Sequence, residues 1–112
     1  MQINISTRHG HLSAATQEKI GEKLQRLGKF HDRISAALVT VDLEFEADPS
    51  IEIILSVEHA NDIVAREEGS GLWGTLDGAI EKLEKQLRKR KEMIKGHKSE
   101  SPKRREGGQA GA

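Results

Sequence analysis

The sequence lacks cysteine, which excludes disulfide bonds, thiolate metal sites and a cysteine nucleophile. A chain without thiols suits a reducing compartment, so we expect a cytoplasmic protein. Long hydrophobic runs are also absent, because 35% of the residues are apolar and no run approaches the ~20 residues of a membrane helix. The opening segment 1–10 alternates like a strand and does not resemble a signal peptide. We therefore expect a soluble protein without a membrane partner.

Catalytic motifs are missing as well. The chain contains no serine–histidine–aspartate arrangement, no Walker loop and no dinucleotide-binding glycine pattern. His9 and His11 are spaced so that they could hold a metal, but no third ligand lies near them in the sequence. We therefore expect no enzymatic activity, no metal, no cofactor and no small-molecule substrate.

Aromatic residues are scarce, and tyrosine is absent. Phe30, Phe45 and Trp73 are the complete set. We expect Phe45 to lie in the core and Trp73 to pack at the start of a helix. Because this leaves no row of platforms for stacked bases, any nucleic-acid contact should be mainly to the phosphates of structured RNA.

The dominant feature that is present is a helix predicted over residues 72–95. Apolar residues recur there every three or four positions, which places them along one side of the helix. They are Leu72, Leu76, Ala79, Ile80, Leu83 and Leu87. The stripe stops at Arg90 and Lys91, although helix-forming residues continue. We therefore expect the helix to pack on a core with its first part and to project a basic end beyond it.

Charge is concentrated at this end, although the formal net charge of the chain is zero. Residues 82–105 contain eleven Lys or Arg and three Glu, which is a local charge of +8. Glu81 and Glu84 each precede a cation by four residues, so part of this charge fits a solvated helix with internal ion pairs. Such pairing does not account for the four adjacent cations at 88–91, which surround the helix and repel one another. This run favours contact with a nucleic acid.

The rest of the chain is punctuated by turns. Alternating apolar residues predict four short strands, and Ser13 is positioned to cap a first helix whose buried side carries Ile20, Leu24 and Leu27. The strands are expected over 1–6, 35–46, 51–57 and 63–67, the first helix over about 13–29, and turns at 48–50 and 60–62.

These elements predict an α+β fold in the order β-α-β-β-β-α. The helix between the first two strands makes them parallel, and the tight turns make the later pairs antiparallel. The result is a four-stranded mixed sheet with two helices packed on one face. We expect the domain to span 1–95 and a disordered basic, glycine-rich tail to span 96–112. The outer face should be acidic, with Thr40, Asp42, Glu44, Glu52 and Glu58 on it.

Three segments carry a family resemblance that spans about residues 1–95. The chain opens with MQINISTRH, its first predicted helix ends in EKLQRLGKFHDRI, and its last contains AIEKLEKQLRKRKE. Together and in this order they resemble the ribosome hibernation-promoting factor family, which includes ribosome-associated inhibitor A. The EKLEKQLRKRK block is the most specific part of the match.

The resemblance implies a regulator of translation rather than an enzyme. It implies binding to the 16S rRNA of the small ribosomal subunit, alone or in the 70S ribosome, where the protein would occlude the mRNA path and the A- and P-site tRNA positions. Members act under starvation or in stationary phase, as a stress response. The implied rRNA-binding residues are Arg8, Lys19, Lys23, Arg26, Lys29, Lys82, Lys85, Arg88, Lys89, Arg90 and Lys91.

The chain resembles the short form of the family, because long members carry a second domain that pairs two ribosomes. Short members differ in whether they promote or prevent ribosome dimers, and the sequence leaves this open. Two other functions also remain open: a general module that binds structured RNA, and a regulatory protein that modulates a sigma factor. We expect the free protein to be a monomer.

Overall fold

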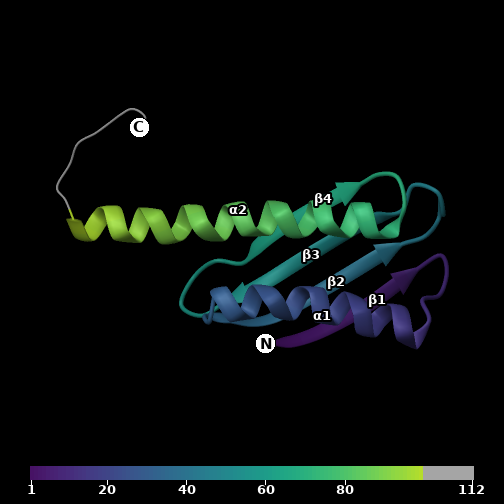
Figure 1. The fold of residues 1–112 in the computed structure, drawn as a ribbon, viewed down its shortest axis with the longest axis horizontal. Coiled ribbons are helices and arrows are strands. Elements are labelled where there is room, and N and C mark those ends of the chain that lie inside the picture. The colour runs from purple at the N-terminus through teal and green to yellow at the C-terminus, as the bar shows by residue number, and fades with distance from the viewer. Residues whose placement is uncertain (100–112) are drawn as a thin grey trace.

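Four strands form one sheet, and both helices cover the same face of it (Figure 1). The computed structural model describes residues 1–99, with side chains described for residues 1–91. The elements are β1 (Gln2–Arg8), α1 (Ala14–Phe30), β2 (Ile34–Asp42), β3 (Ser50–Val57), β4 (Ile63–Glu68) and α2 (Leu72–Ser99). The predicted α+β fold and its β-α-β-β-β-α order are confirmed.

The strands lie in the sheet in the same order as in the chain, β1-β2-β3-β4. As predicted, β1 is parallel to β2, and the two later pairs are antiparallel. The register aligns residues that face the helices, so a single row crosses all four strands. That row consists of Ile5, Val39, Ile53 and Ala65.

Helix α1 begins where its cap was predicted. The Ser13 hydroxyl accepts a hydrogen bond from the backbone N–H of Thr16 at 3.1 Å, which satisfies one of the free amides of the first turn. The helix buries Ile20, Leu24 and Leu27, the three residues of the predicted stripe. These side chains pack into the core between α1 and the sheet.

Helix α2 follows a glycine that the turn requires. Gly71 has a φ of 80°, a left-handed conformation that a side chain disfavours, and its carbonyl accepts from the hydroxyl of Thr75 at 2.7 Å. From there the predicted stripe enters the core. Leu76, Ala79 and Leu83 are fully buried.

The predicted place of Phe45 in the core is wrong, because β2 ends at Asp42 rather than at 46. The carboxylate of Asp42 accepts from the backbone N–H of Glu44 at 3.0 Å, and the N–H of Asp48 donates to the carbonyl of Phe45 at 2.9 Å. These local bonds replace the strand ladder with a turn. The Phe45 side chain is consequently 69% exposed.

The outer face of the sheet is mixed, rather than acidic as predicted. Glu44 and Glu58 lie beyond the ends of their strands, so they do not contribute to the face. Arg66 pairs with Glu52 across the two antiparallel strands β3 and β4. An apolar row crosses the strands beside this pair, and its members are Leu38, Ile54 and Val64.

Helix α2 continues to Ser99, four residues past the expected domain boundary at Lys95. The internal glycine at Gly96 costs roughly 1 kcal/mol relative to alanine, which a long helix tolerates. The remainder of the expected tail, 100–112, lies outside the described residues. Within residues 1–99, no helix has the length and hydrophobicity needed to span a membrane.

The packing predicts that Leu83→Ala lowers the free energy of unfolding by about 2–5 kcal/mol, because Leu83 is fully buried and its removal leaves a cavity. Urea denaturation followed by circular dichroism measures this change. Lys85→Ala is the matched control on an exposed position of the same helix and should change stability by about 0.5 kcal/mol or less. Equal effects of the two substitutions would contradict the packing.

Candidate nucleic-acid interface

The two helices lie over the same face of the sheet and run in the same direction (Figure 1). Nζ of Lys23, midway along α1, lies 3.0 Å from Oδ1 of Asp77, near the start of α2. Near the end of α1, His31 lies close enough to Lys91 and Arg88 of α2 for their charges to act on it. The predicted cations of both helices therefore share one side of the domain.

Two of the cations on α1 contact an aromatic ring. Nζ of Lys19 and Nζ of Lys23 lie 5.8 Å and 6.0 Å from the ring centre of Trp73, which is the distance range of a cation–π interaction. Trp73 is half-buried and packs against the core, as predicted for it. Because Lys23 also pairs with Asp77, these two lysines are partly engaged inside the protein.

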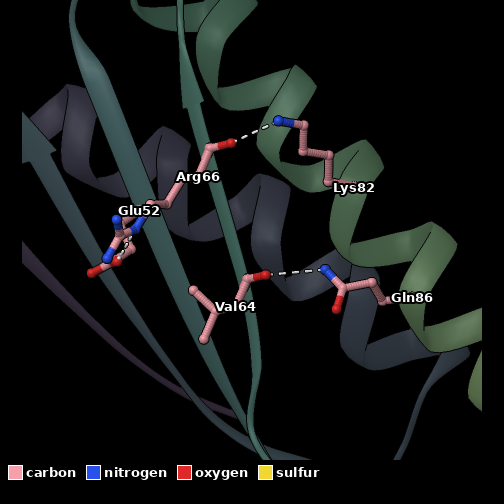
Figure 2. Close-up of polar contacts among 5 residues, drawn as sticks. All are labelled: Glu52, Val64, Arg66, Lys82 and Gln86. Atoms are coloured by element: carbon pink, nitrogen blue, oxygen red, sulfur yellow. Dashed lines mark hydrogen bonds and ion pairs between the residues drawn. The ribbon is translucent and has the colours of Figure 1, made fainter.

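A second group of polar side chains on α2 contacts the edge strand β4 (Figure 2). The carbonyl of Arg66 accepts from Nζ of Lys82 at 2.8 Å, and the carbonyl of Val64 accepts from Nε2 of Gln86 at 3.0 Å. One turn further along, Arg90 donates to the carbonyls of Asn61 and Asp62 at 2.7 Å and 3.3 Å. We call Lys82, Gln86 and Arg90 the edge ladder.

The spacing of the edge ladder follows from the geometry of the two elements. Four residues of a helix rise about 6 Å, and two residues of a strand rise about 6.7 Å, so donors at 82, 86 and 90 match carbonyls at 66, 64 and 62. Carbonyls at a sheet edge would otherwise be open to pairing with another chain. The edge ladder therefore gives Lys82 and Arg90, both predicted to bind rRNA, a structural role.

Six of the predicted cations on the two helices remain exposed and unengaged. Within residues 1–91, where side chains are described, none of the ion pairs or side-chain hydrogen bonds involves them. They are Arg26, Lys29, Lys85, Arg88, Lys89 and Lys91. We call these six residues the free cation surface.

Arg8 is separated from the other predicted site residues. Its side chain is exposed on the outer face of the sheet, opposite Asp42 in the parallel register of β1 and β2. The alternation of β1 could have indicated this, because Ile3 and Ile5 face the helices and even-numbered residues face away. The structure therefore brings the helix cations together and leaves Arg8 on the other side.

His31, which caps α1, was not among the predicted site residues. Partial burial, followed by the positive charge of Lys91, lowers the pKa of His31; Glu84 opposes this shift, and Arg88 adds to it. The neutral imidazole is therefore the favoured form beside the free cation surface. The spacing of residues in the sequence could not predict this pKa shift, because His31 comes close to Lys91 only through the packing of the two helices.

A small cluster at the opposite end of the domain joins His9 to two acids. Ligand atoms of His9, Asp42 and Glu44 lie within 4.8 Å of one another, although His9 and the acids are far apart in the sequence. Nδ1 of His9 lies 2.9 Å from Oδ1 of Asp42, and a hydrogen bond from the Glu44 N–H lowers the pKa of Asp42, with His9 adding to the shift. These contacts join the loops after β1 and β2 and explain the cluster without a metal.

Comparison with known proteins shows which family the chain belongs to. The family model described as "Sigma 54 modulation protein / S30EA ribosomal protein" matches residues 3–95. The chain belongs to this family. A family member, the ribosome hibernation promoting factor of Escherichia coli K12, is 32% identical over 97 residues, which cover 87% of this chain and 100% of the relative. The ribosome hibernation promoting factor of Pseudomonas putida is 29% identical over 92 residues, which cover 82% and 88%.

Solved structures of similar proteins share the fold. A ribosomal subunit interface protein from Coxiella burnetii superposes with a TM-score of 0.72 at 25% identity, covering 81% of this chain and 98% of the other. The N-terminal domain of Thermus thermophilus Protein Y gives a TM-score of 0.71 at 24% identity, covering 80% and 98%. The second likeness supports the fold alone. The family resemblance expected from the sequence is thus confirmed.

The edge ladder predicts that cations on one helix have different roles. The double substitution Lys82→Ala/Arg90→Ala should lower the free energy of unfolding by about 1–3 kcal/mol, because it removes hydrogen bonds to a carbonyl of β4 and to the carbonyls of the two residues before it. Lys85→Ala/Lys89→Ala removes the same charge from the free cation surface and should change stability by about 0.5 kcal/mol or less. Urea denaturation compares the two. Equal losses would show that the edge ladder does not stabilise the fold.

The lowered pKa of His31 predicts a pH dependence of stability. As pH falls below the unfolded histidine pKa of about 6.5, the unfolded chain takes up a proton that the folded chain resists, so the free energy of unfolding decreases. His31→Gln lacks this contribution and should lose less stability over the same pH range. Thermal or urea unfolding at several pH values tests the difference. Parallel pH profiles for the two proteins would contradict the predicted shift.

Proposed function

We propose that this protein binds the small ribosomal subunit through the free cation surface and stops translation while it is bound. The single observation that carries the proposal is the grouping of six exposed, unengaged cations on the side of the domain formed by its two helices. Mutual repulsion among such charges is relieved when they contact a polyanion. The names of the relatives, which refer to ribosome hibernation and to the ribosomal subunit interface, support the ribosome as that polyanion.

The proposed mechanism is steric occlusion. Bound to 16S rRNA in the 30S subunit or the 70S ribosome, the domain would occupy the path of mRNA and the A- and P-site tRNA positions, as the family resemblance implies. No bond is made or broken in this process, so it needs no catalytic residue, metal or cofactor. With the ribosome as its partner, the protein would act in the cytoplasm, and starvation or stationary phase is the proposed setting.

The proposed contact set differs from the one implied by resemblance. Arg26, Lys29, Lys85, Arg88, Lys89 and Lys91 form the contact, with Lys19 and Lys23 beside them. Lys82 and Arg90 act through the fold, because they hold α2 against β4. Arg8 is left out of the contact, because it lies on the opposite face of the sheet.

Two other functions make distinct predictions. A general module for structured RNA would bind bulk tRNA as well as it binds ribosomal particles, so excess tRNA would displace it. A modulator of a sigma factor, the other activity that the family's name refers to, would act through a protein. Its binding would resist ribonuclease and depend little on salt. Binding through phosphates weakens steeply as salt rises.

The proposal predicts that Lys85→Glu/Lys89→Glu weakens binding to small ribosomal subunits about tenfold or more at moderate salt, and that the slope of log affinity against log salt becomes shallower by about 1.5–2. Both side chains are exposed and have no partner within residues 1–91, so the fold should be retained. Fluorescence anisotropy with labelled protein, measured over a range of salt, gives both quantities.

The matched control places the same change of charge on the other face of the sheet, as Arg8→Glu/Arg66→Glu. It should retain affinity within about threefold, because screening weakens charges that lie beyond about 8–10 Å of the phosphates. Equal weakening by both double substitutions would mean that overall charge, and not the helix side, governs binding. Unchanged binding by Lys85→Glu/Lys89→Glu would remove the proposed contact.

A further inference from the structure

Phe30, the last residue of α1, is a large apolar side chain left open to solvent. Its side chain is 70% exposed, although the neighbouring Leu27 on the same helix is buried in the core. A phenyl ring in water gains roughly 1.5–3 kcal/mol when it is fully covered. A ligand that covers Phe30 would therefore gain binding free energy. Phe30 lies on the side of the domain that carries the free cation surface.

The ring borders a hollow between the two helices. The hollow has a volume of about 230 Å³ and is lined by Lys23, Arg26, Leu27, Phe30, Asp77, Ile80 and Glu84. Leu27 and Ile80 are its apolar residues besides Phe30, and both belong to or pack against the core. Its volume is below the roughly 300–1,000 Å³ of sites for drug-sized ligands, so it suits one flat ring rather than a larger molecule. We call it the Phe30 hollow.

The charged lining of the Phe30 hollow is divided between the two helices. Lys23 and Arg26 come from α1, and Asp77 and Glu84 come from α2. Lys23 and Asp77 neutralise one another at 3.0 Å, which leaves Arg26 and Glu84 without a partner within residues 1–91. Arg26 is suited to a phosphate, and a glutamate carboxylate accepts hydrogen bonds from an exocyclic amine of cytosine or adenine.

The neighbourhood of the hollow is cationic. The charges of Glu84, Arg88 and Lys91 all act on His31, which follows Phe30 directly, so these residues gather at the end of α1. The phosphates next to a base in the hollow would therefore lie within the electrostatic attraction of Arg88 and Lys91. An aromatic ring, an apolar floor, a carboxylate acceptor and surrounding cations are the parts that single-stranded nucleotide sites combine.

We propose that the Phe30 hollow binds one unpaired nucleobase of the ribosomal RNA, stacked on Phe30, with Glu84 accepting from the amine of cytosine or adenine. The inference rests on the proposed function and names a contact within it. It also revises the expectation that the scarcity of aromatic residues limits recognition to phosphates. One exposed ring suffices for one base.

Stacking and phosphate contact have different dependences on salt, and this separates them. Phe30→Ala should weaken binding to purified 16S rRNA and to small subunits about tenfold at every salt concentration, without changing the slope against log salt. Phe30→Trp should bind at least as tightly as the wild type, and Phe30→Leu should bind like Phe30→Ala. Stacking would be overturned if Phe30→Ala or Phe30→Leu bound with wild-type affinity. It would also be overturned if the slope of log affinity against log salt became shallower together with the loss of affinity.

Phe45→Ala is the matched control. Phe45 is 69% exposed, as Phe30 is 70% exposed, but it lies in the β2–β3 loop, away from the hollow. It should bind both RNA and small subunits like the wild type. Equal loss in Phe30→Ala and Phe45→Ala would overturn the assignment to the hollow. Thermal unfolding confirms that each variant keeps the fold.

Short oligonucleotides test the choice of base and keep this inference separate from the ribosome. Fluorescence anisotropy should show tighter binding of the wild type to oligo(C) and oligo(A) than to oligo(U), and Glu84→Leu should lose that difference. Equal affinity of the wild type for the three would overturn the role of Glu84. If the wild type shows this base preference but does not bind small subunits, the proposed function fails and the hollow stands as a general RNA site. If small subunits bind and Phe30→Ala changes nothing, the hollow alone fails.

Discussion

The structure depends on how α2 is held against the sheet. One side of the helix is fixed by burial, with Leu76 and Leu83 in the core, and an adjacent side is fixed by the hydrogen bonds of Lys82 and Gln86 to the edge strand. Burial sets the depth of the helix, and the bonds to β4 set its rotation and its register along the strand. With both fixed, the remaining sides of the helix must face solvent or α1.

This constraint sorts the cations of the helix into roles. Those beside β4 satisfy carbonyls that would otherwise form an open sheet edge. Those on the outward side, such as Lys85 and Lys89, have no partner within residues 1–91 and are presented at fixed positions. Because the helix backbone is already ordered, binding to a fixed array of phosphates costs mainly the ordering of the lysine and arginine side chains, about 0.5–1.5 kcal/mol each. The domain can therefore bind a ribosomal surface without rearranging its fold.

Most of the fold could be predicted, because strand alternation and the helical stripe each record which side of an element meets the core. The end of β2 could not, since the alternation continues to Phe45 while a bond between Asp42 and the Glu44 amide ends the strand. The sequence predicted the site only as a set of cations, and in the sequence Lys82 and Lys85 are equivalent, because both are lysines of the same helix. They differ because one of them faces β4, and that is a property of tertiary packing.

The most direct measurement of the central claim is co-sedimentation of the purified protein with 30S, 50S and 70S particles through a sucrose cushion, at low and high salt. The account predicts that the protein pellets with 30S and 70S particles at low salt, is released at high salt, and does not pellet with 50S particles. Equal pelleting with 50S particles would contradict a specific site on the small subunit. Failure to pellet with any particle would remove the ribosome from the account.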